Sequence, residues 1–243
     1  MTWDELRLIH PWLPETSEGW HQHPNGKGWV QDTARVTDSA QVSGNAQVYG
    51  NAQVSGNALV YGNALVCDCA QVCGNAQVYG NARVCGDAQV YGKAQVYGNA
   101  LVCGNALVCD RARVYDRALV CDRALVCDRA QVYGNAQVCD RAQVYDRARV
   151  SGNARVCDRA QVCGNVQVYG IHNISPIYIQ GSRYWIGYSG CGDVSSGCIT
   201  KPLSWWLENV ERCAEEHGYT PEEQVEYRSH VEHIATWMEL HVS

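Results

Sequence analysis

Cysteine carries most of the reactive chemistry in this sequence. Six cysteines recur at intervals of eighteen residues: Cys67, Cys85, Cys103, Cys121, Cys139 and Cys157. If the chain coils once per eighteen residues, they stack on one outer side about 4.8 Å apart. Thiolates in such a row could clamp a soft metal ion such as Cu(I) or Zn(II). The alternative is that duplication of an eighteen-residue unit copied the cysteines without selection for thiols. No other cofactor is expected.

Two histidine pairs have spacings that suit a metal ligand set. His21 and His23 lie two residues apart, and His230 and His233 would share one helix face. The second pair has three cysteines near it in sequence, Cys191, Cys198 and Cys213. Their spacing matches no zinc-finger pattern, so solvent-facing histidines and core cysteines remain the alternative to a zinc site.

A six-residue repeat positions the cysteine row. The phrase Ala-x-Val-x-Gly-Asn, as at residues 46–51, recurs with a valine on every sixth position from Val30 to Val168. Alanine and valine stand two residues apart, so in a strand of about three residues they point to the same side. The polar pair that follows predicts a corner. A glycine or aspartate every six residues, with so much valine, argues against helix. The repeat therefore predicts a solenoid with a valine and alanine core.

The corners predict a particular backbone conformation. The residue two after each valine is always glycine or aspartate, whereas the next residue varies and includes Thr33, Lys93 and Arg111. Positive φ costs glycine little, is tolerable for aspartate and is unfavourable for a β-branched residue. We therefore expect positive φ at the first corner position, for example at Gly50 and Asp122.

The residues that follow valine show that one coil contains three hexads. Taken eighteen residues apart, they fall into three columns, and cysteine dominates one column and is absent from another. The column without cysteine contains a row of tyrosines: Tyr61, Tyr79, Tyr97, Tyr115 and Tyr133. A period of eighteen beneath a period of six predicts three flat sides and about eight coils, a prism roughly 38 Å tall.

The outer faces suggest two modes of binding. Stacked tyrosine rings stabilise a sheet by about 0.5–1.5 kcal/mol per pair, and the same rings could contact a protein partner, a glycan or another copy. Two leucine pairs also point outward and predict side-by-side pairing of two rods, as in a homodimer: Leu101 with Leu119, and Leu107 with Leu125. The Asp-Arg corners place opposite charges one residue apart, so we expect them to be near neutral and solvated.

The flanking segments are expected to form caps, giving divisions at 1–28, 29–170 and 171–243. Thr2 and Glu5 predict a capping box that opens a short helix, and Trp12, Trp20 and Trp29 are expected to cover the open end of the valine stack. After residue 171 we expect a small β-hairpin over 174–200. Helices are predicted over 202–217 and from Thr220 to about residue 240, which makes an α/β cap.

The repeat resembles the bacterial hexapeptide repeat, as in Val-Tyr-Gly-Asn-Ala-Gln, which implies a left-handed parallel β-helix. The flanks, with Gly28-Trp29-Val30 before the repeats and Trp206-Leu207 and His217-Gly218-Tyr219-Thr220 after them, resemble a family of repeat proteins from phages, prophages and gut bacteria. Such proteins are often labelled putative transferases by fold. Hexapeptide acyltransferases resemble one another in having a catalytic histidine on a coil or on a loop that leaves a coil. This chain has none between His23 and His172, so His172 is its candidate.

Charge and hydropathy narrow the classes of function. The net charge is −6, no basic face is obvious, and no long apolar run occurs, so neither nucleic acid nor a membrane is an expected partner. No signal peptide is evident, which suggests a bacterial cytoplasm or a phage particle. The sequence favours a non-enzymatic scaffold that presents flat faces to a protein partner or to itself. A thiol-ladder metal-binding or redox protein is the alternative, and an acyltransferase is the third.

Overall fold

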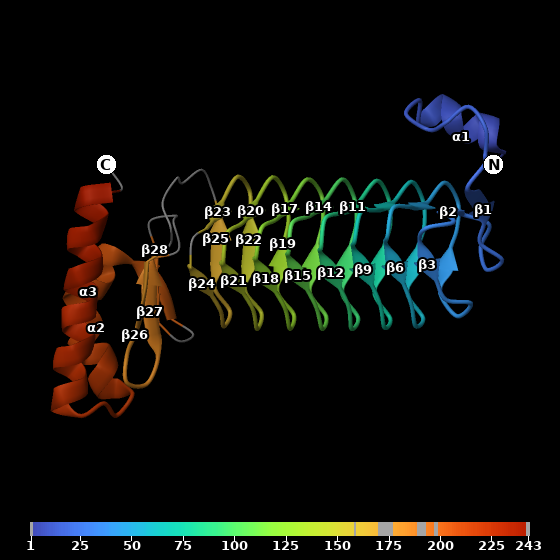
Figure 1. Ribbon diagram of the computed structural model, residues 1–243. Coiled ribbons are helices and arrows are strands. Elements are labelled where there is room, and N and C mark those ends of the chain that lie inside the picture. Colours follow the sequence, from blue (N-terminus) through green and yellow to red (C-terminus); the bar gives the residue numbers. More distant parts are fainter. Residues whose placement is uncertain (1, 158, 170–176, 189–192, 197–198, 242–243) are drawn as a thin grey trace.

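A computed structural model describes residues 2–157, 159–169, 177–188, 193–196 and 199–241. Most of the chain forms a rod built from three parallel sheets (Figure 1). Partners in register are eighteen residues apart, as Val78 is from Val60 and from Val96. The prediction of a mainly β solenoid with three sides and about eight coils is confirmed, as are structured elements at both ends of the rod.

Each sheet is named here after the residues that follow its valines. The cysteine face consists of β1 (Trp20–Gln22), β2 (Trp29–Gln31), β5 (Gln47–Val48), β8 (Leu65–Val66), β11 (Arg83–Val84), β14 (Leu101–Val102), β17 (Leu119–Val120), β20 (Gln137–Val138) and β23 (Arg155–Val156). The mixed face consists of β3 (Arg35–Val36), β6 (Gln53–Val54), β9 (Gln71–Val72), β12 (Gln89–Val90), β15 (Leu107–Val108), β18 (Leu125–Val126), β21 (Gln143–Val144) and β24 (Gln161–Val162). The tyrosine face consists of β4 (Gln41–Val42), β7 (Leu59–Val60), β10 (Gln77–Val78), β13 (Gln95–Val96), β16 (Arg113–Val114), β19 (Gln131–Val132), β22 (Arg149–Ser151) and β25 (Gln167–Tyr169).

Most of these strands are two residues long rather than the predicted three. The alanine of each hexad lies outside the strand, and in most hexads its N–H donates to the carbonyl of the residue that follows the preceding valine, as from Ala76 to Cys73 at 3.4 Å. N–H groups on both sides of the corner donate to the next coil, as from Ser55 to the Val72 carbonyl at 2.9 Å and from Asn57 to the Gly74 carbonyl at 2.7 Å. Hydrogen bonds between coils therefore continue through the corners.

The core of the rod is a column of alanine and valine side chains. From Ala40 to Val150, every alanine and valine on the inward positions is at most 1% exposed. Burial falls off only toward the ends, where Ala34, Val36 and Ala160 are partly buried. Each coil is therefore stabilised by packing against its two neighbouring coils, because its own inward side chains are all small.

Positive φ occurs where the sequence predicted it. All described first-corner residues between Gly44 and Gly164 have positive φ, including Gly50 at 69° and Asp122 at 60°. The prediction is wrong at Asp32 and Asp38, the first two corners, which are not among the positive-φ residues. There the hydroxyl groups of Thr33 and Ser39 donate to the carbonyls of Gly50 and Gly56, at 2.5 and 2.6 Å. A side chain thus replaces the backbone N–H that makes this bond in later corners.

The N-terminal segment packs against the flank of the first coils. Helix α1 (Trp3–Ile9) opens with the predicted capping box between Thr2 and Glu5. The tryptophans do not cover the open end as expected. Trp29 lies on the cysteine face under Trp3, with their ring centroids 4.9 Å apart, and Trp12 and Trp20 contact the Tyr49 ring.

Backbone rather than tryptophan covers two of the three sheet edges at this end. Strand β1 pairs antiparallel with β2, and the chain then crosses the edge of β4. The Gly28 N–H donates to the Val42 carbonyl at 2.7 Å, and the Val42 N–H donates to the Asn25 carbonyl at 3.1 Å. A Cβ at Gly28 would lie 2.5 Å from Val42 Cγ1, so this approach requires glycine.

The C-terminal unit contains more sheet than predicted. Instead of one hairpin, it has a four-stranded antiparallel sheet of β26 (Ile177–Gln180), β27 (Trp185–Tyr188), β28 (Asp193–Ser196) and β29 (Ile199–Pro202). The predicted helices are present as α2 (Leu203–Glu216) and α3 (Pro221–His241), and they pack on this sheet (Figure 1). None of the helices in the described residues is long and apolar enough to cross a membrane.

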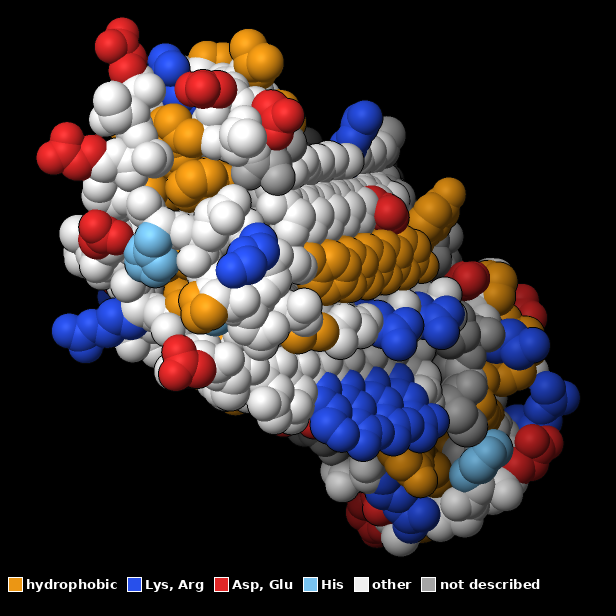
Figure 2. All heavy atoms as spheres, turned by 90° about the vertical axis from the view of Figure 1, so that its right-hand side faces the viewer, with side chains coloured by type: hydrophobic (Ala, Val, Ile, Leu, Met, Phe, Trp, Pro, Cys, Tyr) orange, Lys and Arg blue, Asp and Glu red, His pale blue; other side chains and the backbone are white. Residues whose placement is uncertain are grey.

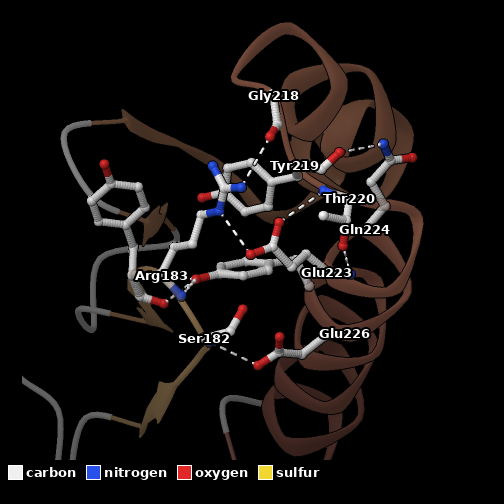
Figure 3. A network of polar contacts seen from close by, with 10 residues as sticks. Ser182, Arg183, Gly218, Tyr219, Thr220, Glu223, Gln224 and Glu226 are labelled. Carbon is white, nitrogen blue, oxygen red and sulfur yellow. Dashed lines mark hydrogen bonds and ion pairs between the residues drawn. The ribbon is translucent and has the colours of Figure 1, made fainter.

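A polar network joins the β26–β27 turn to the turn between the two helices (Figure 3). Thr220 and Glu223 form the predicted capping box at the start of α3. Arg183 pairs with Glu223 at 2.8 Å and lies over the Tyr219 ring. The Tyr227 hydroxyl donates to the Tyr184 carbonyl at 2.5 Å and accepts the Arg183 N–H at 3.2 Å. The network fixes the sheet against the beginning of α3.

Candidate functional site

The tyrosine face carries a regular row of stacked aromatic rings. Consecutive rings among Tyr61, Tyr79, Tyr97, Tyr115 and Tyr133 have centroids 4.8–5.0 Å apart and planes within 2° of parallel. All five side chains are half-buried. Because parallel strands in strict register position these rings, they form one row that runs along five successive coils.

The surroundings of the tyrosine row are mostly uncharged and form hydrogen bonds. Desolvation raises the pKa of the Tyr79 and Tyr97 phenols, which therefore stay neutral. The Tyr115 hydroxyl donates to Gln131 Oε1 at 3.3 Å. At the next corner, the amides of four asparagines bond one another from coil to coil at 2.8–3.2 Å: Asn45, Asn63, Asn81 and Asn99.

The cysteine row has the predicted register. Along the cysteine face, each strand pairs in register with the strand eighteen residues later, and each of the six cysteines comes directly after the valine of its strand. The paired residues before these valines are Leu65, Arg83, Leu101, Leu119, Gln137 and Arg155. Cys67 is buried, the other five are half-buried, and none of these six described cysteines forms a disulfide. Burial raises the pKa of Cys139 to about 11 and that of Cys121 to about 12. These thiols are protonated at neutral pH, which makes them weak nucleophiles.

Aspartates at the corners bring a third potential ligand to some of the cysteines. In three groups of the described residues, two thiol sulfurs from neighbouring coils and one carboxylate oxygen lie within 4.8 Å of one another. The groups are Cys67–Asp68–Cys85, Cys109–Asp110–Cys127 and Cys139–Asp140–Cys157. The group at Cys109 lies on the mixed face, outside the predicted ladder. The Cys-Asp dipeptide with a cysteine eighteen residues after the first was the signal for it in the sequence.

In the Asp-Arg corners, the aspartate and the arginine side chains have different surroundings. The Asp128 carboxylate accepts the backbone N–H of Asp146 at 3.1 Å, and the Asp146 carboxylate accepts that of Gly164 at 2.9 Å. The arginines that follow are exposed, and no ion pair among the described residues involves Arg111, Arg129 or Arg147. Figure 2 shows the resulting rows, with hydrophobic side chains along one line of the rod and Lys and Arg along another.

Shallow grooves follow the two charged corners. One, of about 730 Å³, runs beside Lys93, Arg111, Arg129 and Arg147, and the other, of about 630 Å³, beside Arg123, Arg141 and Arg159. Aspartates line both grooves as well. Because each aspartate stays within one residue of its arginine, the corner remains close to neutral overall, as solvated corners would be.

The outward leucines form two separate pairs rather than one patch. Leu101 pairs in register with Leu119 on the cysteine face, and Leu107 pairs with Leu125 on the mixed face. All four are half-buried. A corner separates the two pairs, so a partner that docks flat on one face reaches only one of them.

The histidine candidates do not come together in a metal site. The His21 side chain bonds the Asp32 carboxylate at 2.8 Å, whereas His23 is 2% exposed and bonds the Asn25 carbonyl. His230 bonds Glu226 at 3.3 Å. No metal-like group in the described residues includes a histidine. Three predicted candidates lie outside the described residues: His172, Cys191 and Cys198.

The C-terminal unit contains a pocket that sequence reasoning missed. It has a volume of about 230 Å³ and lies between the sheet and the two helices. Trp206, Val210, Tyr219 and Tyr227 contribute to its largely apolar wall. Some of the lining residues, including Trp206, Cys213 and Tyr219, were singled out in the sequence, but they were not placed together, because the pocket combines residues from β28, β29, α2 and α3.

Comparison with known proteins supports the architecture. Four segments of the rod, residues 52–68, 76–92, 94–110 and 142–158, match the family model described as YdcK Beta solenoid repeat. Neither the curated proteins nor the solved structures gave a match. Each matched segment covers nearly one coil, and together they include strands of all three faces. The chain is therefore a repeat β-helix protein.

Proposed function

We propose that this protein is a non-enzymatic structural scaffold that binds a protein partner, or a second copy of itself, through its tyrosine face. The observation that carries the proposal is the row of five parallel tyrosine rings at 4.8–5.0 Å. Tyrosine supplies a large contact area at low entropic cost and is enriched at protein interfaces. Here the rings are ordered before any partner arrives, which lowers the cost of binding further.

The chemistry of this face suggests the character of the partner. Arg113 and Arg149 are the only charged residues among the outward residues of its strands, which otherwise carry Gln and Leu between the alanines and valines. A flat surface with apolar groups, carbonyl oxygens and a few carboxylates would complement it. From the sequence we place this interaction in a bacterial cytoplasm or in a phage particle.

Enzymatic alternatives have less support. The repeats contain no histidine, and in the described residues the chain passes from coil to coil with uniform corners, so none of the described coils carries a loop that could build the wall of a substrate pocket. The acyltransferase alternative depends on His172. Binding of an acyl donor that is lost in His172→Ala would favour that alternative over a scaffold.

A matched pair of variants tests the proposed face. Tyr79→Ser with Tyr97→Ser and Tyr115→Ser removes the centre of the row, and Cys85→Ser with Cys103→Ser and Cys121→Ser changes the same coils on another face. Self-association is measured by light scattering over a range of concentrations, and partner binding by chemical crosslinking in bacterial extract with mass spectrometry. We expect complexes with the wild type and the cysteine variant, and loss of them only in the tyrosine variant. Equal behaviour of both variants, or no complex with the wild type, would contradict the proposal.

A further inference from the structure

We propose that each Cys–Asp–Cys group binds one borderline or soft divalent cation, such as Zn²⁺ or Cd²⁺, through two thiolates and one carboxylate oxygen. The groups lie at Cys67, Asp68 and Cys85, at Cys109, Asp110 and Cys127, and at Cys139, Asp140 and Cys157. Two thiolates with one carboxylate are a ligand set that suits zinc and disfavours the hard cations calcium and magnesium. The inference does not depend on the tyrosine face.

The ligand atoms already lie close to the positions that a tetrahedral ion requires. Within each group the two sulfurs and the carboxylate oxygen are no more than 4.8 Å apart. Two sulfurs bound at about 2.3 Å in a tetrahedral site are about 3.8 Å from each other, so small side-chain rotations of up to about 1 Å would close the site. Three protein ligands leave the fourth position for water.

The thiols already interact with the carboxylates that would join them as ligands. Cys67, Cys109 and Cys139 each point Sγ at the Oδ2 atom of the next residue, at 3.8, 3.4 and 3.5 Å. An ion would replace the thiol proton in this contact. The reaction is balanced: two thiols and one divalent cation give a dithiolate complex and two protons, with no change of oxidation state.

Backbone donors hold the carboxylates in place. The Asp68 carboxylate accepts the Gly86 N–H at 2.9 Å, and the Asp110 carboxylate accepts the Asp128 N–H at 3.4 Å. Outer-shell donors of this kind orient a ligating carboxylate. Cys103, which lies outside the three groups, is followed by glycine, so its coil offers no carboxylate at this position.

The distinction gives a stoichiometric test with a matched control. Metal-free protein, purified and kept anaerobic, is titrated with Cd²⁺, and binding is measured by equilibrium dialysis and by the ultraviolet thiolate-to-cadmium band. We expect saturation at three ions, one for each group among the described residues. Cys127→Ser is expected to remove one ion, and Asp110→Asn to weaken one site by about tenfold or more. Cys103→Ser, a ladder thiol outside the groups, should leave all three.

Several outcomes would overturn the proposal. They are no binding at micromolar Cd²⁺, loss of an ion in Cys103→Ser like that in Cys127→Ser, or an unchanged affinity in Asp110→Asn. Equal loss in the two cysteine variants would show that the ladder binds metal as one continuous row of thiols. Circular dichroism establishes that each variant is folded. Asp110→Asn keeps every cysteine, so it tests the site even if a serine variant does not fold.

Discussion

The rod and the C-terminal unit use different means to bury apolar surface. In the rod, core residues are alanine and valine on repeating positions, and each contacts equivalents in the coils on either side. In the C-terminal unit, large residues from sheet and helices meet in an irregular core, with Ile186, Trp206, Tyr227 and Ile234 all at most 3% exposed. The rod therefore depends on register, whereas the C-terminal unit depends on a few large, unique contacts.

The two regions also use charge differently. Ion pairs of the described residues lie at the N-terminal segment and in the C-terminal unit, as between Arg183 and Glu223 and between Arg228 and Glu232. In the rod, which contains all the Asp-Arg corners, aspartate bonds backbone N–H groups and arginine faces solvent. A charged pair that is adjacent in sequence is thus no guide to an ion pair in the fold.

The largest effect should come from breaking the uniform core. Val102 is fully buried between Val84 and Val120, so Val102→Asp would place an unpaired carboxylate among valines. We expect a loss of more than about 4 kcal/mol in the free energy of unfolding. Leu101→Asp, one residue away and facing outward, should cost less than about 1 kcal/mol. Denaturant unfolding followed by circular dichroism compares the two, and similar losses would refute the inward and outward assignment.

Removal of a tyrosine hydroxyl group should reduce stability in the C-terminal unit but not in the tyrosine row. Tyr227→Phe removes the acceptor of the Arg183 backbone N–H and one of the two donors to the Tyr184 carbonyl, which should cost about 1–3 kcal/mol. Tyr97→Phe keeps the stacked ring and should change stability by no more than about 0.5 kcal/mol. Thermal unfolding of both variants checks the contrast. The reverse order of effects would mean that hydroxyl groups, rather than ring stacking, stabilise the tyrosine row.

The corners predict a still smaller effect that depends on conformation. Asp128 has φ of 59°, and its carboxylate accepts the Asp146 N–H. Asp128→Ala should cost about 1–2 kcal/mol, because alanine is strained at positive φ. Asp128→Gly should cost less, since glycine removes the strain. Arg129→Ala is expected to change stability by no more than about 0.5 kcal/mol. Chemical denaturation distinguishes the three, and a larger loss for Arg129→Ala than for Asp128→Ala would show that arginine holds the corner.

The stability of the rod should also depend on alkaline pH, through thiols that are buried or half-buried. Burial raises the pKa of Cys121 and Cys127 to about 12 and that of Cys109 to about 11, against about 8.5 in an unfolded chain. The folded protein therefore keeps protons that the unfolded chain releases. This contribution to stability is fully present below about pH 8.5 and is lost as the pH rises toward 11–12.

Unfolding measured between pH 8 and pH 11 tests this linkage. Stability should fall with rising pH, and the fall should be shallower in a variant that combines Cys109→Ser, Cys121→Ser and Cys127→Ser. Circular dichroism at each pH gives the fraction folded. A flat profile in the wild type, or the same slope in both proteins, would mean that the thiols titrate normally in the folded rod.

Much of the fold could be predicted because the decisive signals are local and repeated. Valine on every sixth position defines the core, and glycine or aspartate two residues later defines the corner. The prediction was wrong where a single side chain alters a corner, as Thr33 and Ser39 do. The four-stranded C-terminal sheet could not be read from periodicity, because its pairing depends on contacts between segments distant in sequence.

The candidate sites were predictable in part for the same reason. The rows of tyrosine and cysteine follow from the period of eighteen, and the structure gives their register. The direction of the aspartate side chains does not follow from any period. It depends on the N–H group that the next coil presents and on the S–H group of the preceding residue. Cys109 and Cys127 lie in a column that contains both cysteine and tyrosine, so they were not recognised as a candidate group.

Hydrogen exchange of the backbone amides, followed by mass spectrometry, measures whether the rod is a rigid support for its faces. If register along the whole valine stack holds the coils, peptides between residues 59 and 150 should exchange slowly and at similar rates, with faster exchange confined to the first and last coils. Rapid exchange of single interior coils, in particular those that carry Tyr79 to Tyr115, would contradict the account, because a row of rings on opening coils is not a preformed binding surface.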